Sequence, residues 1–144
     1  MSADRRRVWI VACTAALAAA TALCGCGGVI VQDDFAVQRS GAGPGGNLTI
    51  VVNDAGTVRC DGKPAVPVTD PQLIQARYIS TTLATPAQHG LTLPPQPGSV
   101  FRYYVRTPDG HVSFSDNSKD QPSIFPQLQL LTLQIAQQDC HLTQ

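Results

Sequence analysis

The chain is short, and beyond its first residues it is slightly acidic. It has 144 residues, of which 10 are Lys or Arg, 10 are Asp or Glu and 5 are Cys. Beyond Cys26 it has seven Lys or Arg and nine Asp, with no Glu and no basic run. Binding to nucleic-acid phosphates needs clustered positive charge, so we exclude nucleic acid as a partner. A chain of this length forms one small domain.

The N-terminus has the pattern of a bacterial lipoprotein signal peptide over residues 1–25. Arg5-Arg6-Arg7 forms a positive n-region, and the uncharged run 8–23 has the length of an h-region. Leu23-Cys24-Gly25-Cys26 then supplies the aliphatic residue, the small residue and the cysteine that a lipoprotein signal peptidase requires. We therefore expect a diacylglyceryl group on Cys26, which anchors the mature protein in the cell membrane on its extracytoplasmic side. A plain secretory leader and an uncleaved anchor are the alternatives.

The remaining cysteines form one pair. Cys13 and Cys24 leave with the signal peptide and Cys26 carries lipid, so that Cys60 and Cys140 remain. The oxidising compartment favours a disulfide between them, which would close a loop of about 80 residues and stabilise the domain by about 4 kcal/mol. Two separate buried thiols are the alternative. A metal site is not expected, because only His141 lies near either cysteine.

Alternating apolar side chains predict three short strands in the first half, over residues 34–39, 48–52 and 57–60. Phe35 and Val37 face inward in the first strand. Residues 40–46 contain four glycines and one proline, which predicts a loop. The second and third strands form a hairpin, and residues 61–64 break the pattern.

Thr69-Asp70-Pro71 predicts the start of a helix, with Thr69 or Asp70 as the cap, and this helix ends before Pro86. A loop rich in Pro and Gln follows over 87–98. Two strands, 100–106 and 111–115, flank the turn Pro108-Asp109-Gly110. A second helix over 122–138 carries one apolar stripe, made of Ile124, Leu128, Leu131 and Ile135.

The expected fold is therefore α+β, in the order strand, strand, strand, helix, strand, strand, helix. About five strands form an antiparallel sheet, with two helices packed on one face. The expected domains are the signal peptide 1–25, a lipidated N-terminus and tether 26–33, and the folded domain 34–144.

Residues able to carry catalysis are scattered along the chain. The histidines beyond Cys26 (His89, His111 and His141) form no ligand pair or nucleophile pattern. Asp109, Asp116 and Asp120 surround one hairpin, where turn and capping roles explain them better than a calcium site. We expect no metal, no cofactor and no enzymatic activity.

Several motifs resemble emfourin-like proteins, the small inhibitors of protealysin. The first is Val37-Gln38-Arg39-Ser40-Gly41-Ala42-Gly43 followed by a hairpin. The others are Phe101-Arg102-Tyr103-Tyr104-Val105, then Pro108-Asp109-Gly110, then Phe114, Asp116 and Pro122, and a last helix with Leu128 and Leu131. The resemblance spans roughly residues 34–138. The chain departs from the family in its glycine loop, its lipid anchor and its cysteine pair.

The resemblance implies a compact domain that binds a thermolysin-type metallopeptidase through exposed loops, although a shared fold does not establish shared inhibition. The expected partner-binding loop includes Ser40, Gly41, Ala42 and Gly43, with a flexible hairpin loop as the alternative. A second hypothesis is an accessory envelope lipoprotein that contacts another envelope protein through its sheet face or residues 93–98. A small-molecule carrier is disfavoured, because so small a domain has little room for a large cavity.

Overall fold

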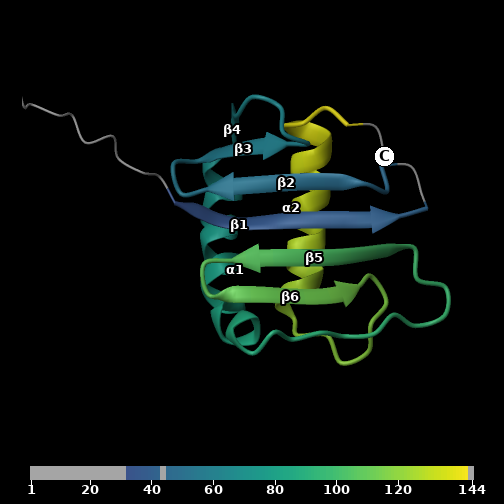
Figure 1. Cartoon of the computed structure of the whole chain (residues 1–144). Helices are drawn as coiled ribbons and strands as arrows, with labels where there is room; N and C mark the ends of the chain where they lie inside the picture. Colours follow the sequence, from purple (N-terminus) through teal and green to yellow (C-terminus); the bar gives the residue numbers. More distant parts are fainter. Residues whose placement is uncertain (1–31, 43–44, 143–144) are drawn as a thin grey trace, which may run out of the picture. The chain divides into compact units, whose positions relative to one another are not determined.

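The fold is α+β, with two helices lying on one face of an antiparallel sheet (Figure 1). The computed structural model describes residues 32–42 and 45–142. The six strands lie in the order β4-β3-β2-β1-β5-β6. Their bounds are β1 Asp33–Gly41, β2 Leu48–Asn53, β3 Thr57–Cys60, β4 Val66–Pro67, β5 Phe101–Thr107 and β6 Gly110–Ser115. The helices are α1 Asp70–Gln88 and α2 Ile124–Gln138, so the predicted fold class is confirmed.

The first strand of the chain lies in the middle of the sheet. β1 pairs antiparallel with β2 on one side and with β5 on the other. The strand was expected to end at Arg39, but its pairing with β5 continues through Ser40 and Gly41, opposite Arg102 and Phe101. The loop prediction was wrong for these two residues. A partner about 60 positions away sets the end of the strand, and local glycine content does not reveal that partner.

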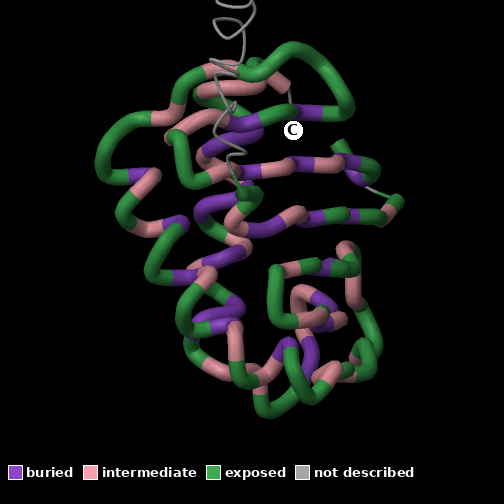
Figure 2. Tube along the Cα trace, turned by 60° about the vertical axis from the view of Figure 1, so that its left-hand side comes forward, coloured by how far each residue is buried: buried purple, intermediate pink, exposed green. Residues whose placement is uncertain are grey.

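Alternate strand residues pack against the helices to form the core (Figure 2). The sheet contributes side chains that are 1% exposed or less, namely Val37, Ile50, Val52, Val105 and Val112. The helices contribute others equally buried, namely Ile79, Leu83, Leu128, Leu131 and Ile135. Three aromatic rings join the layers, with centroid distances of 5.1 Å for Tyr103–Phe114 and 4.1 Å for Phe114–Phe125. The predicted inward faces of the strands and of the last helix are confirmed.

Helix α1 begins as predicted. Thr69 is its N-cap and forms a capping box with Gln72, whose side-chain oxygen accepts a hydrogen bond from the Thr69 backbone N–H at 2.8 Å. The Thr69 hydroxyl in turn accepts from the Gln72 N–H at 3.5 Å. Such a cap contributes about 1 kcal/mol.

The predicted end of α1 before Pro86 was wrong, because the helix continues through Pro86 to Gln88. Pro86 lacks a backbone N–H, but burial of Ala87 in the core holds the last turn in place. After Gln88 and the C-cap His89, the chain leaves the helix through Gly90, which has a φ of 61°. The N–H groups of Gly90 and Leu91 donate to the carbonyls of Ala87 and Pro86, each at 3.0 Å, as in a Schellman motif.

Helix α2 begins at Ile124, two residues later than predicted. Pro122 precedes it in a turn, where its carbonyl accepts from the Phe125 N–H at 2.9 Å. Pro126 lies in the first turn of the helix, where backbone N–H groups have no intrahelical acceptor, so its ring removes no helical bond.

Neither edge of the sheet is a long unpaired strand, because β4 is short and β6 is partly covered by residues 91–93. β4 was not predicted and consists of two residues, one of which is Pro67, which has no N–H to donate. At the other edge, residues 91–93 run beside β6 and bond to Ser113. The Ser113 N–H donates to the Leu91 carbonyl at 2.9 Å, and the Leu93 N–H donates to the Ser113 carbonyl at 2.8 Å.

A disulfide joins Cys60, at the end of β3, to Cys140, just beyond α2. Their Cα atoms are 6.0 Å apart, within the range for a bridged pair. The predicted pairing is confirmed, and it ties the last helix to the sheet.

Candidate functional site

The expected partner-binding residues lie at one end of the central strand. Ser40 is exposed and Gly41 is half-buried at the end of β1, while Ala42 is an exposed bend residue. Gly43 lies outside the described residues. The structure therefore places Ser40 and Gly41 on a paired strand beside β5, and only Ala42 beyond it.

Gly41 lies where the end of β1 comes unusually close to the backbone of Val100, the residue before β5. A Cβ atom at this position would fall on the carbonyl oxygen of Val100 and would lie 2.7 Å from Cδ1 of Phe101. Real Cβ atoms do not approach other atoms so closely, so a larger residue would require β5 to shift. The glycine thus allows the segment before β5 to lie directly against β1.

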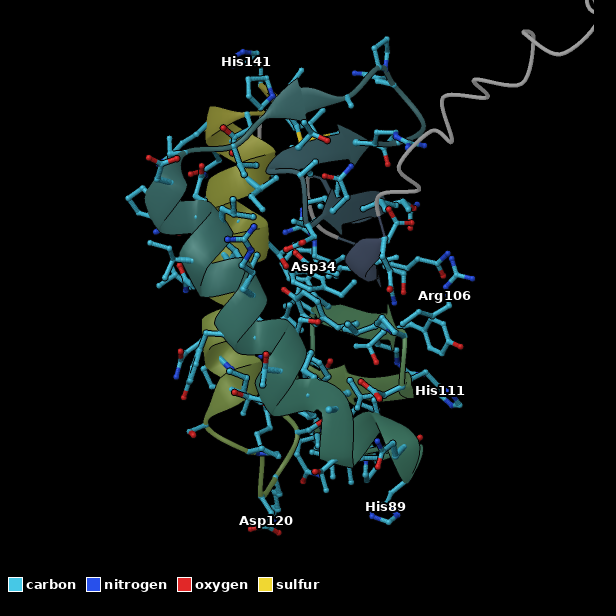
Figure 3. All side chains as sticks on the ribbon, turned by 90° about the vertical axis from the view of Figure 1, so that its left-hand side faces the viewer. Asp34, His89, Arg106, His111, Asp120 and His141 are labelled. Carbon is cyan, nitrogen blue, oxygen red and sulfur yellow. A yellow bond between two sulfur atoms is a disulfide. The ribbon has the colours of Figure 1, made fainter. Side chains whose placement is uncertain are left out.

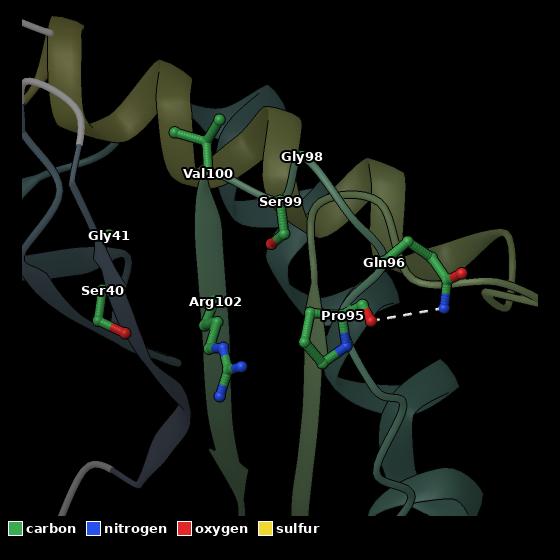
Figure 4. A pocket seen from close by; sticks show the side chains of 8 residues that line it. All are labelled: Ser40, Gly41, Pro95, Gln96, Gly98, Ser99, Val100 and Arg102. Carbon is green, nitrogen blue, oxygen red and sulfur yellow. Dashed lines mark hydrogen bonds between the residues drawn. The ribbon is translucent and has the colours of Figure 1, made fainter.

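A depression of about 350 Å³, which we call the strand-end depression, lies beside this close approach (Figure 4). Its lining comes from the end of β1 and from the segment that leads into β5, and consists of Ser40, Gly41, Pro95, Gln96, Gly98, Ser99, Val100 and Arg102. Ser40 and Arg102 occupy paired positions on neighbouring strands. The exposed Arg102 guanidinium gives the depression a positive charge and five hydrogen-bond donors.

A carboxylate beside the depression fixes the start of β5. Asp116 accepts hydrogen bonds from the Ser99 hydroxyl at 2.9 Å and from the backbone N–H groups of Val100 at 3.1 Å and Phe101 at 3.2 Å. Ser115 lies beside Ser99, and its hydroxyl donates to the Phe101 carbonyl at 3.0 Å. Burial acts to raise the pKa of Asp116, but the hydrogen bonds from Val100, Ser99 and Phe101 outweigh it and lower that pKa below the usual value.

The residues after Asp116 fasten the proline-rich segment in the same way. The Asn117 side chain accepts from the Gln96 N–H at 3.0 Å and donates to the Gln96 carbonyl at 3.1 Å. The Ser118 hydroxyl donates to the Pro94 carbonyl at 2.9 Å. Gln121 donates to the carbonyls of Ser115 and Ser118, each at 3.0 Å. The proline-rich side of the depression is therefore held in place by hydrogen bonds from Asn117 and Ser118.

A buried arginine lies near the other wall. Arg39 is 4% exposed and faces the core side of β1, in line with Phe35 and Val37. It donates to the Gly45 carbonyl at 2.6 Å, and its guanidinium carbon lies 4.8 Å from the centre of the Phe101 ring. Burial raises the pKa of the neighbouring Tyr103, against the lowering effect of the Arg39 charge and of their hydrogen bond. Arg39 thus links the chain beyond β1 to the start of β5.

A second, more apolar depression of about 370 Å³ lies between the end of α1 and the start of α2. It is lined by Thr82, Thr85, Pro86, His89, Leu91, Pro122, Ser123 and Ile124. It shares no lining residue with the strand-end depression, and it was not predicted.

The other candidate residues stay apart. His89 and His141 are exposed beyond the ends of the two helices, and His111 lies on β6 with its ring 5.5 Å from that of Tyr104. Asp109 accepts from Gln88 at 3.3 Å, at the far end of β6 from Asp116. Within residues 32–42 and 45–142, no group of three or more His, Cys, Asp or Glu side chains could hold a metal ion.

The sequence pointed to Ser40, Gly41 and the segment 93–98, but not to the other residues that shape the strand-end depression. Arg102 alternates with the inward residues of the predicted strand 100–106, so its exposure could have been inferred. Arg39 continues the inward series of Phe35 and Val37, which was the signal for a buried charge. The partners of Asp116 and Asn117 lie about 15 to 21 positions away, and no local pattern indicates them.

Comparisons with protein-family models, with curated proteins and with solved structures found no match to the chain. The resemblance to emfourin-like proteins therefore depends on the quoted motifs alone. Cys26 lies outside the described residues. In the part of the chain that the structure describes, no helix is both long enough and apolar enough to cross a bilayer.

Proposed function

We propose that this chain is a bacterial lipoprotein, anchored in the cell membrane through a diacylglyceryl group on Cys26 and facing the extracytoplasmic side. The proposal is supported by the motif Leu23-Cys24-Gly25-Cys26 and by the cysteine inventory. Once Cys26 is assigned to lipid, the two cysteines left in the mature chain are the two that form the disulfide.

Mass spectrometry of the mature protein, isolated from bacterial membranes, tests the anchor. We expect an acylated Cys26 at the N-terminus, and release of the protein from the membrane fraction in a Cys26→Ser variant that carries an ordinary cleavable leader. An unmodified N-terminus at Gly27 or any later residue would refute lipidation.

We further propose that the domain binds another protein without catalysing a reaction, and that the strand-end depression is part of the binding surface. One observation carries this proposal, namely that hydrogen bonds within the chain itself hold the depression in its shape. Asn117 and Asp116 hold the lining residues Gln96 and Val100 by hydrogen bonds, and Gly41 permits the close approach of the Val100 backbone to β1. A surface already in its binding conformation loses less conformational entropy on association.

A thermolysin-type metallopeptidase is the partner that the resemblance favours. Residues 27–144 would be titrated against such a peptidase, with inhibition expected at micromolar concentration or below. Arg102→Gln should weaken the inhibition, whereas Lys63→Gln, which removes the same charge from the loop between β3 and β4, away from the depression, should not. Absence of inhibition at micromolar concentration would eliminate the inhibitor hypothesis.

The second candidate is an accessory envelope lipoprotein, and one observation favours it. The segment 93–98, expected to contact an envelope component, supplies Pro95 and Gln96 to the strand-end depression. Affinity capture from an envelope extract tests this candidate, with Gln96→Ala expected to reduce recovery. Capture of nothing by the unaltered protein would count against it.

A further inference from the structure

The sheet has a second face, on the side away from the helices. The strand residues that point to this side are exposed or half-buried, and they include Ala36, Gln38, Thr49, Val51, Arg59, Arg102, Tyr104, Arg106, His111 and Ser113. Figure 3 shows Arg106 projecting from the sheet away from α1 and α2, with His111 on the same side of the sheet, near Gly90 just beyond α1. Side chains on this face are therefore available to a partner.

Positive charge gathers on this face. Three of the five described arginines, Arg59, Arg102 and Arg106, lie on it and are exposed. Arg39 is buried, and Arg77 on α1 bonds to Asp54 at 2.8 Å. The two lysines beyond Cys26 lie in loops, at positions 63 and 119. We call Arg59, Arg102, Tyr104, Arg106 and His111 the arginine face.

Strand register sets the spacing of these charges. Arg59 pairs with Val51, Val51 with Ala36, Ala36 with Arg106, and Arg106 with His111. This row crosses five strands, so the Cα atoms of Arg59 and Arg106 lie roughly 14 Å apart at about 4.8 Å per strand. Arg102 lies on the same strand as Arg106, at a Cα distance of roughly 13 Å, with Tyr104 between them.

Aspartate is kept away from the interior of this face. In the described chain the aspartates lie at the start of β1, in turns and loops, or on α1. Asp34, at the bulge in β1, has its carboxylate near Asp54 and Arg77, toward α1. A domain with more acidic than basic residues thus presents one predominantly positive surface.

The residue types indicate what this surface binds. Arg and Tyr are enriched in protein interfaces and Lys is depleted, and here the cations are arginines beside a half-exposed tyrosine. A guanidinium matches a carboxylate with two parallel hydrogen bonds. Basic segments that bind anionic membranes usually have four to eight Lys or Arg, more than the three arginines here.

We propose that the arginine face docks an acidic protein surface, whose carboxylates pair with Arg59, Arg102 and Arg106 around Tyr104. This rests on the proposed function, that the domain binds a protein. Arg102 also lines the strand-end depression, so the two regions form one continuous surface. The complementary charge speeds encounter and fixes orientation, and binding therefore weakens as salt rises.

Poly-L-glutamate is the probe for the charge chemistry, and residues 27–144 suit the test because the buried core lies within residues 35–136. In a titration followed by NMR, the largest changes in amide chemical shift should occur at Arg59, Tyr104, Arg106 and His111. The double variant Arg59→Gln/Arg106→Gln should bind about ten-fold more weakly. Both residues lie outside the strand-end depression and are exposed, so the variant should remain folded.

The matched control is Lys63→Gln/Lys119→Gln, which removes the same charge from loops and should bind as the unaltered protein does. The proposal would be overturned if both double variants bound poly-L-glutamate equally weakly. It would also be overturned if the amide chemical shifts changed mainly outside the arginine face, or if the titration showed no saturable binding. Tighter binding through the same amides to vesicles of phosphatidylglycerol and phosphatidylcholine would also overturn it and assign the face to a membrane.

Partner capture separates this inference from the proposed function. If the unaltered protein and Arg59→Gln/Arg106→Gln capture the same partner equally well, the protein-binding function stands and the arginine face is refuted. If the unaltered protein neither inhibits a peptidase nor captures a partner, the proposed function itself fails.

Discussion

Loss of the Cys60–Cys140 disulfide should lower the free energy of unfolding by about 4 kcal/mol. The two cysteines are separated by 80 positions. In the chain-entropy model, a crosslink that closes such a loop removes about 15 cal/mol/K from the unfolded state, or about 4.5 kcal/mol at 25 °C. Because small domains have roughly 5–15 kcal/mol in total, this loss would bring the protein close to its unfolding threshold.

A mutant cycle measures the effect. Cys60→Ala, Cys140→Ala and the double variant would be unfolded in urea at pH 7 and followed by far-UV circular dichroism, with a reductant present for the variants. Each single variant already breaks the crosslink, so each should lose most of the 4 kcal/mol and the double variant little more. The unaltered protein in reductant is the control and should approach the double variant. If each single substitution instead costs under about 1 kcal/mol and the two costs add, the cysteines act as separate thiols and the crosslink argument is wrong.

Three further outcomes are expected in the same unfolding assay. Gly110→Ala should destabilise the domain by about 2 kcal/mol or more, because Gly110 has a φ of 148° and a Cβ would fall on the Ala87 carbonyl oxygen. A change in the free energy of unfolding under about 0.5 kcal/mol would show that the end of α1 moves aside at little cost. Arg77→Gln should cost less than about 1 kcal/mol, because Arg77 and Asp54 form an exposed ion pair with side chains 51% and 60% accessible. A larger loss would mean that this pair is not a simple surface contact. Asp116→Asn should destabilise most above pH 4, because the lowered pKa of Asp116 makes its ionised form stabilising above the unfolded value of about 3.9. That contribution is lost as pH falls through the folded pKa, so the gap between the unaltered protein and Asp116→Asn should narrow below pH 4, and a constant gap would contradict the reasoning.

Much of the fold could be predicted from local pattern. The alternation in β2, β3, β5 and β6 and the stripe in α2 follow directly from burying one face of each element, and the cap at Thr69 is a local motif. The ends of elements could not be predicted as well. Pro86 stays helical because Ala87 is buried in the core, and β4 exists because β3 offers it a free edge.

The candidate site was only partly predictable. The glycine loop drew attention to Ser40 and Gly41, but the property that matters at Gly41 is its closeness to Val100, which lies 59 positions later. Asp116 was expected to stabilise a turn, and it does so for a segment before β5 rather than for its own hairpin alone. Side-chain to backbone bonds between distant segments leave no periodic trace in the sequence.

The central position of β1 has a consequence for how the chain acquires its structure. β1 and β2 are close in sequence and can pair early in folding, but β5 begins at Phe101. Until β5 pairs with it, the other edge of β1 is a row of unpaired N–H and C=O groups, which can pair with another copy of the unfolded chain. Cys140 follows even later, so the crosslink can form only after nearly the whole chain is present. Assembly is therefore governed by contacts of high sequence separation, which slow folding, and the interval before β5 arrives is when the protein is most exposed to aggregation.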